Sequence, residues 1–479
     1  MAERTLEEEF RDYLETLPIQ TLRTLGRKFG SPASSRKNKP ECIESIIELL
    51  TGKADPVPNS GKGAPVKQNF LDPSIIRRLE ELRLAWEKAH KIPEPQNYFT
   101  VHSPKQPKSL YDEPVYSGIL EIMPGGYGFL RSQSCHPSKS DVFIAAPLVQ
   151  SLLLKEGDLV ACTAKQAEKG EPPAMEHLLS VNGMPFPDLS QRPAFEALTA
   201  CYPQERIPLS QKDNTLSLRV IDLFTPIGKG QRALIIAPPQ AGTTTLFKEI
   251  AHSCAALRPQ IHLIVLLING RPEEINEIKS TVPDAEVVFS SFDEDPHQHV
   301  RAAELTVARA KRLAEHGRDV VVLLDSLDHL TKAYHYGTEN MGRSLPGRLD
   351  VGALTMAKRF MGAARNTREA GSITIAATLY TDGSRAGDMI MEEFRQTGNC
   401  EIVLSRQLAA RRIYPAIDLS RSGTRKAELL LTETELSAVR KLSDKIAAGD
   451  LMSILTLMNK TKDNAEFAAK CDEAFSSEK

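Results

Sequence analysis

The chain has 479 residues, of which 41% are apolar and 25% are charged, and its formal net charge at pH 7 is −2. This composition excludes a wholly disordered chain and is typical of a soluble globular protein with roughly two to four domains. Because the net charge is close to zero, any nucleic-acid site has to be a local basic surface. No apolar run approaches the ~18 residues of a membrane span, and the N-terminus does not resemble a signal peptide. We therefore expect a cytoplasmic protein.

The seven cysteines are scattered along the chain, without a Cys-x-x-Cys pair or a histidine at metal-binding spacing. Cysteines in this arrangement are typical of reduced and mostly buried side chains in an intracellular protein. The sequence therefore predicts neither a disulfide nor a zinc site.

Residues 1–50 are expected to form a small helical module. A second helical pattern follows Pro40, and the connection at 36–39 is basic. This connection either contacts phosphates or is a solvated turn. The apolar residues of the first pattern, at about helical spacing, are Leu14, Leu17, Leu22, Leu25 and Phe29.

Residues 51–112 are rich in proline, glycine, lysine and asparagine, which is typical of a linker. One helix is expected within it, because Asp72-Pro73 can cap and start a helix and an apolar stripe runs from Ile75 to Trp86. We expect this stripe to pack on a domain or on a partner subunit.

Residues 113–190 contain short apolar segments at close spacing, which favours a small β-barrel of the OB or cold-shock kind. Tyr127 and Phe129 are two residues apart, so both rings stand on one face of a strand. The neighbouring glycines and Arg131 would leave that face open and positive, as in a stacking platform for single-stranded bases. The alternative is that both rings belong to the barrel core. The residues assigned to the platform are Gly126, Tyr127, Gly128, Phe129, Leu130 and Arg131.

Residues 191–479 are assigned to one domain, and up to residue 432 they alternate apolar strands with helices. This alternation indicates a parallel sheet covered by helices. Residues 433–479 are helical and charged. Strands are expected at 233–237, 262–268, 286–289, 320–324, 373–379 and 401–404, and helices near 244–257, 272–280, 298–316 and 349–369.

The strand 233–237 leads into a turn rich in proline and glycine and then into a helix. That order is the layout of a phosphate-binding loop, in which backbone N–H groups and the helix N-terminus face an anion. Gly242 and Thr244 occupy the last glycine and the hydroxyl position of the usual G-x-x-x-x-G-K-[ST] motif. The lysine position holds Thr243 and the first glycine position holds Ala237, so the pattern alone does not identify the loop.

Asp325 ends the apolar strand 320–324, where a carboxylate would meet Mg²⁺ opposite Thr244. Thr244 and Asp325 are therefore the candidate metal ligands. Basic residues also follow the strand 401–404. They could reach the γ-phosphate bound by a neighbouring subunit or belong to a solvated helix, and the sequence does not decide between these readings. These residues are Arg406, Arg411 and Arg412.

Taken together, these segments resemble the bacterial Rho family of transcription termination factors over essentially residues 6–470. The resemblance implies a ring of six subunits, each with an N-terminal helical module, a cold-shock-like barrel that grips cytosine-rich single-stranded RNA, and an α/β RecA-like P-loop ATPase domain. It also implies ATP and Mg²⁺ between subunits, RNA threaded through the ring, and RNA polymerase as a partner. The matching stretches are 118–122, 126–131, 226–232, 271–274, 323–326, 358–360, 362–366, 415–418 and 421–426.

The resemblance also assigns roles to single residues. The primary RNA site would include Tyr127, Phe129 and Arg131, with Asp141 and Phe143 nearby. Two loops at 342–350 and 382–387 would contact RNA in the ring centre, with Arg343 and Arg385 as their cations. Arg406 and Arg412 take the places of arginines that act on a neighbouring subunit, and Asp325 serves the metal. The nucleotide cradle would be Gly228, Lys229, Gly230, Gln231, Arg232, Ala233, Gln240, Ala241, Gly242, Thr243, Thr244, Thr245 and Arg271.

The chain departs from the family pattern at catalytic positions. Where the family reads Lys-Ala-Gly-Lys-Thr, residues 240–244 read Gln-Ala-Gly-Thr-Thr, so two lysines on the phosphate side are lost. Gly270 stands where the family has the carboxylate that orients the attacking water. Neither Lys229 nor Lys248 is expected to compensate. Because the loss of either group typically costs orders of magnitude in rate, the sequence predicts weak nucleotide binding and very poor ATP hydrolysis.

Two smaller departures accompany these. Asp328-His329 replaces a Thr-Arg pair of the family, and Met175 stands near the position of an aromatic residue beside the barrel's RNA site.

Three hypotheses follow. The chain is an RNA-dependent ATPase and helicase that terminates transcription, with compensation elsewhere in its site. Alternatively, it is a non-hydrolysing RNA-binding ring, or a regulatory subunit mixed with an active relative, in which Arg412 could still serve a neighbouring site. The retained arginines beside a lost lysine and a lost glutamate favour the second and third hypotheses.

Overall fold

The computed structural model describes residues 6–28, 38–50, 115–132, 135–165, 172–185, 189, 192–211, 215–257, 260–337, 350–381, 383–447 and 450–476. The chain divides into two compact units, Met1–Pro104 and Lys105–Lys479, and each is described by itself. The expected helix of the linker and residues 36 and 37 of the basic connection lie outside the described residues. Within the described residues, no helix is both long and apolar enough to span a membrane.

The described part of the first unit is a small helical module. Its helices are α1 (Leu6–Glu15), α2 (Ile19–Lys28) and α3 (Lys39–Leu50). They pack around a core that includes Phe10, Leu14, Leu22, Leu25 and Ile46. The expected pattern from Leu14 to Phe29 is therefore not one helix. It breaks before α2, because a proline at position 18 disfavours the helical conformation of the residue before it.

The second unit begins with the predicted β-barrel, which the structure confirms. Its described strands lie in the order β3-β2-β1-β4-β5-β6, and β3 also pairs with β5, which closes the barrel. Leu120, Leu130, Val142 and Val160 fill its core. β5 was not among the expected strands. The elements are β1 (Val115–Ile122), β2 (Gly128–Arg131), β3 (Val142–Ile144), α5 (Ala146–Ser151), β4 (Leu159–Lys165), β5 (Ala174–Val181) and β6 (Met184–Pro185).

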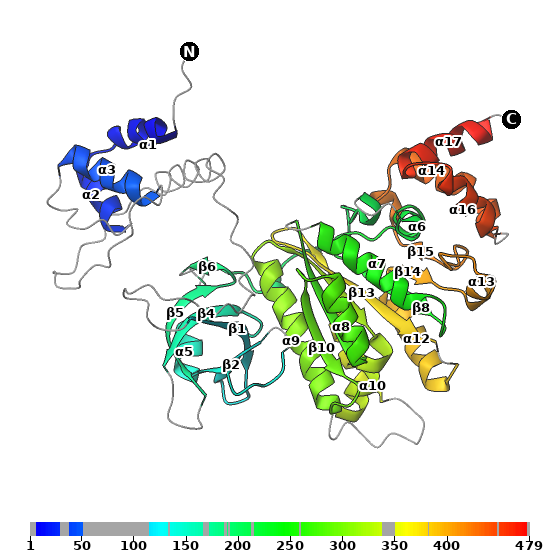
Figure 1. Ribbon diagram of the computed structural model, residues 1–479, viewed down its shortest axis with the longest axis horizontal. Helices are drawn as coiled ribbons and strands as arrows, with labels where there is room; N and C mark the ends of the chain where they lie inside the picture. Colours follow the sequence, from blue (N-terminus) through cyan, green and yellow to red (C-terminus); the bar gives the residue numbers. More distant parts are fainter. Residues whose placement is uncertain are drawn as a thin grey trace, which may run out of the picture. The chain divides into compact units, whose positions relative to one another are not determined.

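The α/β domain is built on the predicted parallel sheet (Figure 1). Among the described residues it has seven strands in the order β10-β9-β11-β13-β8-β14-β15, and only β15 runs antiparallel to its neighbour. The strands are β8 (Arg232–Ala237), β9 (Ile261–Gly270), β10 (Glu286–Ser291), β11 (Asp319–Asp325), β13 (Ile373–Tyr380), β14 (Cys400–Val403) and β15 (Gly423–Thr424).

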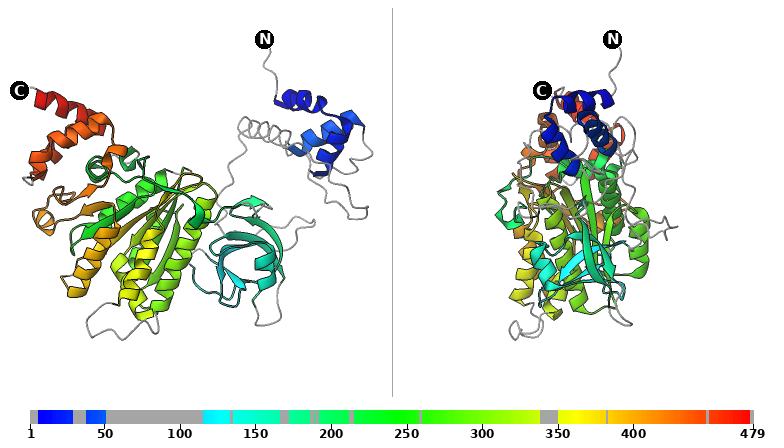
Figure 2. Two further views of the ribbon diagram at one scale, coloured as in Figure 1. Left: turned by 180° about the vertical axis from the view of Figure 1, so that it is seen from behind. Right: turned by 90° about the vertical axis from the view of Figure 1, so that its left-hand side faces the viewer.

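Helices cover both faces of this sheet (Figures 1 and 2). One core cluster joins the sheet to α6 (Leu216–Phe224), α7 (Thr243–Ala256) and α8 (Pro272–Thr281). A second cluster joins it to another group of helices, and of these α10 and α12 were not expected, nor was α6. The second group is α9 (Pro296–Glu315), α10 (Leu327–Gly337), α11 (Val351–Gly362) and α12 (Arg385–Thr397).

Two further differences from the expected helices concern the C-terminal half. α11 ends at Gly362 rather than near 369, because the chain turns there into the short strand β12 (Asn366–Thr367), which pairs with β7 (Ala200–Cys201). The charged C-terminal segment folds as α14 (Glu433–Lys441), α15 (Ser443–Ala447), α16 (Leu451–Asn459) and α17 (Asn464–Ser476).

A buried polar network joins the barrel to α9. The side chain of Arg192 donates to Asp158 of the barrel at 2.6 Å and lies 3.5 Å from Glu315 at the end of α9. Asn182 of the barrel accepts from Arg309 at 2.7 Å. Because buried charges are costly unless they are paired, these contacts fix the barrel against the α/β domain.

Candidate nucleic-acid and nucleotide sites

The loop between β8 and α7 has the backbone of an anion site. Gly242 caps α7 with a φ of 89°, a left-handed conformation that favours glycine, and Gln240 has a φ of 65°. The first N–H groups of a helix have no carbonyl partner within it, and the helix dipole adds partial positive charge there. The loop can therefore face an anion through its backbone.

The lysines near this loop are engaged by carboxylates. Lys229 lies 2.5 Å from a carboxylate oxygen of Glu205 and 2.9 Å from one of Asp319, and Lys248 pairs with Glu277. Burial alone would lower the pKa of Lys229, but the hydrogen bonds to its two carboxylates raise it above its usual range. Both lysine side chains are therefore paired with carboxylates of this chain.

Asp325 is a carboxylate at the carboxyl edge of the sheet, at the end of β11. Burial raises the pKa of Asp325 above its usual range, although a hydrogen bond from the Thr378 hydroxyl at 2.6 Å opposes the shift. A bound divalent cation would favour the ionised form. The carboxylate of Asp325 and the exposed hydroxyl of Thr244 are the oxygen ligands that Mg²⁺ prefers, so the residues fit the ion.

Gly270 at the end of β9 is not required by the backbone. A Cβ atom there would lie 3.2 Å from Cγ1 of Ile275 and 3.5 Å from Cβ of Leu267, so a small shift of Ile275 would admit a side chain. Arg271, the other cradle residue nearby, caps α8. The backbone therefore does not require glycine at position 270 and would also accept a residue with a side chain.

A cavity of about 300 Å³ adjoins the loop and was not anticipated. It is lined by Gly242, by Thr245 and Glu249 of α7, and by Tyr414. A Cβ atom at Gly242 would lie 3.5 Å from the Tyr414 ring, so this half-exposed ring stands directly against the loop. The matched stretch 415–418, which follows Tyr414, was the signal that could have pointed to it.

The cradle residues Gly230, Gln231 and Arg232 hold the start of β8 in position. Gly230 has a φ of 88° and its N–H donates to the Thr374 hydroxyl at 2.8 Å. Gln231 and Arg232 bind Asn399 and the carbonyl of Thr397. These contacts are structural, and they position the strand that leads into the loop.

Three aromatic residues of the barrel form a cluster outside its core. The ring centroids of Tyr127, Phe129 and Phe143 lie 5.8 or 5.9 Å from one another. Tyr127 is 36% exposed, and none of the three rings belongs to the barrel core. The alternative that the rings are core residues is therefore wrong. We call Tyr127, Phe129 and Phe143 the base platform.

The glycine between two of these rings serves the core rather than the platform. A Cβ atom at Gly128 would lie 2.5 Å from Cδ1 of Leu120 inside the barrel. Leu130 is likewise buried in the core, and so is Met175. Gly126 has a φ of 80° in the turn before β2. The expectation that Gly128 keeps the platform open was wrong, because alternate residues of a strand face opposite sides.

Arg131 is not the free cation that the sequence suggested. It is only 6% exposed, and it donates at 2.5 Å both to Glu121 and to Asp141. Its guanidinium carbon lies 4.7 Å from the centroid of the Phe129 ring. The platform therefore stands on a compensated ion cluster instead of an open positive surface.

Comparison with known proteins covers both sites. The Rho termination factor RNA-binding domain matches residues 116–186, and the nucleotide-binding domain of the ATP synthase alpha/beta family matches residues 217–424. The chain is 45% identical to the transcription termination factor Rho of Aquifex aeolicus over 362 residues, which are 73% of this chain and 83% of that protein. The Rho protein of Bacillus subtilis is 45% identical over 357 residues, with the same coverage.

The chain belongs to the Rho family of transcription termination factors. As a member of this family it binds RNA, and the matched RNA-binding domain contains the whole base platform. A solved structure of an ATPase from a type III secretion system aligns with a TM-score of 0.49 and 20% identity, over 64% of this chain and 93% of that one. That likeness is too low to support an argument.

The arginines that the resemblance assigns to a neighbouring subunit and to the ring centre lie on other elements of the chain. Arg406 begins the short helix α13 (Arg406–Ala410), and both Arg406 and Arg412 are exposed. Arg412 has a φ of 60°. Arg385 begins α12. Arg343 and most of the loop at 342–350 lie outside the described residues.

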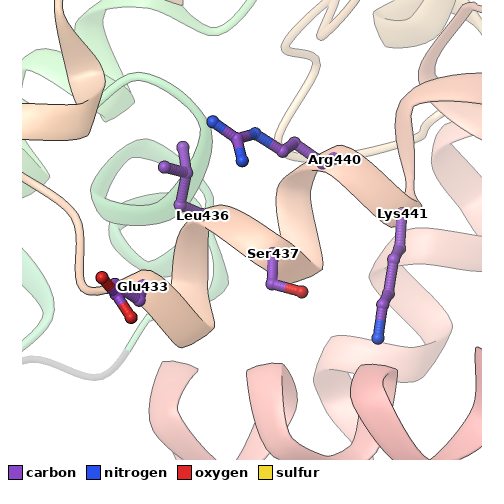
Figure 3. Close-up of a pocket in the computed structure, with 5 residues that line it drawn as sticks. All are labelled: Glu433, Leu436, Ser437, Arg440 and Lys441. Atoms are coloured by element: carbon purple, nitrogen blue, oxygen red, sulfur yellow. The ribbon is translucent and has the colours of Figure 1, made fainter. Parts of the chain in front are cut away.

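A further hollow of about 640 Å³ lies along α14 (Figure 3). Its lining residues all come from that helix and none was assigned to RNA or nucleotide. They are Glu433, Leu436, Ser437, Arg440 and Lys441.

Proposed function

We propose that this chain is an RNA-binding subunit of a Rho-type ring that binds nucleotide weakly and hydrolyses ATP very poorly. One observation carries the proposal. The phosphate loop keeps its backbone geometry, while Lys229 and Lys248 are bound by carboxylates and Thr243 and Gly270 provide no charge. Binding of an anion by backbone N–H groups survives such losses, whereas phosphoryl transfer depends on placed charges.

The RNA site favours cytosine. A base can stack on the base platform, and Arg131 and Asp141 lie behind it as a paired donor and acceptor. The pairing edge of cytosine has an amino donor beside acceptor atoms, which matches a carboxylate beside a guanidinium. Cytosine-rich single-stranded RNA is therefore the proposed ligand, and RNA polymerase is the further partner that family membership suggests.

The nucleotide site retains binding groups without the catalytic set. The cavity beside Tyr414 can hold a base against an aromatic ring, and the N-terminus of α7 can receive phosphate oxygens. Thr244 and Asp325 would hold Mg²⁺, which would neutralise phosphate charge. No group at 270 would orient water, so bound ATP would persist.

A mixed ring is the second candidate. Arg406 and Arg412 are exposed on the surface that follows β14, so both guanidinium groups are available to a neighbouring subunit. In a mixed hexamer with an active Rho protein, Arg412 would complete the neighbour's site although this chain's own site is silent. In that case Arg412→Ala would lower the turnover of the mixed ring and leave that of the active homohexamer unchanged.

ATP hydrolysis by the purified protein, with and without poly(C) RNA, tests the proposal. We expect RNA binding without RNA-stimulated turnover. The variant Thr243→Lys, Gly270→Glu restores both groups and should raise turnover at least ~100-fold. RNA-stimulated turnover by the natural chain would contradict the proposal and would require another phosphate-binding cation.

A further inference from the structure

An arginine of the α/β domain reaches into the ion cluster beneath the base platform. Arg301 lies on α9, and its guanidinium donates to both carboxylate oxygens of Glu121 on β1. One of these oxygens also accepts from Nε of Arg131 at 2.5 Å. A single barrel carboxylate is therefore shared between a guanidinium of the barrel and a guanidinium of the α/β domain.

This sharing determines where Arg131 points. Glu121 and Asp141, both buried, take hydrogen bonds from different nitrogens of the same guanidinium, and the Phe129 ring covers its face. Burial alone would raise the pKa of Glu121, but hydrogen bonds from Arg301 and then Arg131 hold it below the usual range. Because a guanidinium is a rigid planar fork, its orientation follows from its carboxylate partners.

We propose that Arg301 is a positioning residue for RNA recognition, through which the α/β domain fixes Arg131 beneath the base platform. The inference rests on the proposed binding of bases by Tyr127, Phe129 and Phe143. Without Arg301, Arg131 is the cation left on Glu121 among the described residues, and Glu121 draws it away from Asp141. The donor and acceptor behind the platform then no longer match the edge of a cytosine.

A consequence is that RNA binding at the base platform is coupled to the position of α9. The N-terminus of α9 follows β10 at the carboxyl edge of the sheet, the edge at which the nucleotide residues lie. Any displacement of α9 moves Arg301 and so changes the base site. By the reciprocity of coupled binding, a base that orders Arg131 favours the present position of α9.

Arg301 is not needed to hold the two domains together. Arg192 and Asp158 pair at 2.6 Å, Arg309 donates to Asn182 at 2.7 Å, and His136 lies 2.8 Å from Glu294. These contacts between the domains do not involve Glu121. A substitution at 301 therefore perturbs the platform while the junction is retained.

The test uses the full-length chain with the variant Arg301→Met, which keeps an unbranched side chain and removes the donors. Binding of short oligo(C) and oligo(U) RNAs is measured by fluorescence anisotropy at fixed salt. We expect oligo(C) to bind about tenfold more weakly and oligo(U) to change less, so that the C/U preference falls. Arg301→Lys should restore part of that preference. Lys311→Ala is the matched control, because Lys311 lies on the same helix and pairs with Glu196 instead.

Several outcomes would overturn the inference. Unchanged binding and C/U preference in Arg301→Met, together with loss of binding in Arg131→Met, would show that the barrel alone positions Arg131. An equal loss for both RNAs with a large fall in Tm would indicate a purely structural role. Additive losses in a variant that combines Arg301→Met with Arg131→Met would show that the two arginines act independently. If the natural chain binds neither RNA, the proposed RNA function itself fails, which is a distinct result.

Discussion

The base platform and the phosphate loop depend on different parts of the chain for their chemistry. The platform works through side chains, namely three rings and an arginine held between Glu121 and Asp141. The loop works partly through its backbone, which Gly242 and the N-terminus of α7 provide. The platform presents aromatic and charged side chains, whereas the loop presents backbone N–H groups, with threonine at position 243 and glycine at position 270. A binding geometry made by the backbone therefore depends little on which side chains stand beside it.

Removing one aromatic ring tests whether the base platform binds RNA through its side chains. Phe129→Ala should weaken binding of oligo(C) RNA by roughly ten- to a hundredfold, because stacking of a base on an aromatic ring contributes about 1–3 kcal/mol. Titration of labelled RNA measures the loss. Phe292, an exposed phenylalanine of the α/β domain, is the control position, and Phe292→Ala should bind RNA normally. If both variants bind as tightly as the natural chain, the platform is not the RNA site.

Introducing one lysine tests whether the phosphate loop binds ATP and hydrolyses it through different groups. Thr243→Lys alone should tighten ATP binding by about tenfold, because a lysine would meet the phosphates at the helix N-terminus. It should leave turnover low, since position 270 still lacks a carboxylate. Gly270→Glu alone should change ATP affinity little. These affinities are measured by calorimetry, and equal effects of the two single variants would show that the loop does not separate binding from hydrolysis.

The cavity beside the phosphate loop is expected to contribute less to nucleotide binding than the charge restored at position 243. Tyr414→Ala should weaken nucleotide binding by about tenfold or less and leave RNA binding unchanged, because the ring stands against the loop and far along the chain from the platform. Tyr414→Phe keeps the ring and should bind nucleotide like the natural chain. A loss in the phenylalanine variant equal to that in the alanine variant would point to the hydroxyl rather than to stacking.

The smallest of the expected effects is on the pH dependence of the stability of the scaffold that both sites share. Glu286 is buried and pairs with Arg309 and His262. Burial would raise its pKa, but Arg309 and His262 hold it far below the ordinary value of 4.5. The unfolded chain therefore takes up a proton as the pH falls through about 4.5 while the folded chain does not, so this stability is present above that pH and is lost below it.

The matched variant removes both charges together, as Glu286→Leu with Arg309→Met. Between pH 6 and pH 4 the natural chain should lose about 1 kcal/mol more stability than this variant, or about 2–4 °C in Tm. The difference should be the same with and without RNA. An identical acid response of the two proteins would show that this pair does not control the pH dependence of the scaffold.

The sequence alone determined the layout of the protein. Apolar strands alternating with helices predicted the parallel sheet, and the order of strand, glycine turn and helix indicated where a phosphate loop could lie. The two-residue spacing of Tyr127 and Phe129 placed their rings on one face, and Thr243 stands where the phosphate-loop motif has lysine. These features are local, so periodicity and spacing along the chain are sufficient to reveal them.

Only the tertiary structure decided which distant residues meet. Arg131 looked like a free cation until Glu121 and Asp141 were found beside it, and Gly128 proved to face Leu120 in the barrel core. The contact of Tyr414 with Gly242, and that of Arg301 with Glu121, join segments more than a hundred residues apart. No spacing encodes such a meeting, because it arises from the packing of whole elements. The burial that follows then decides whether a charge faces solvent or a partner.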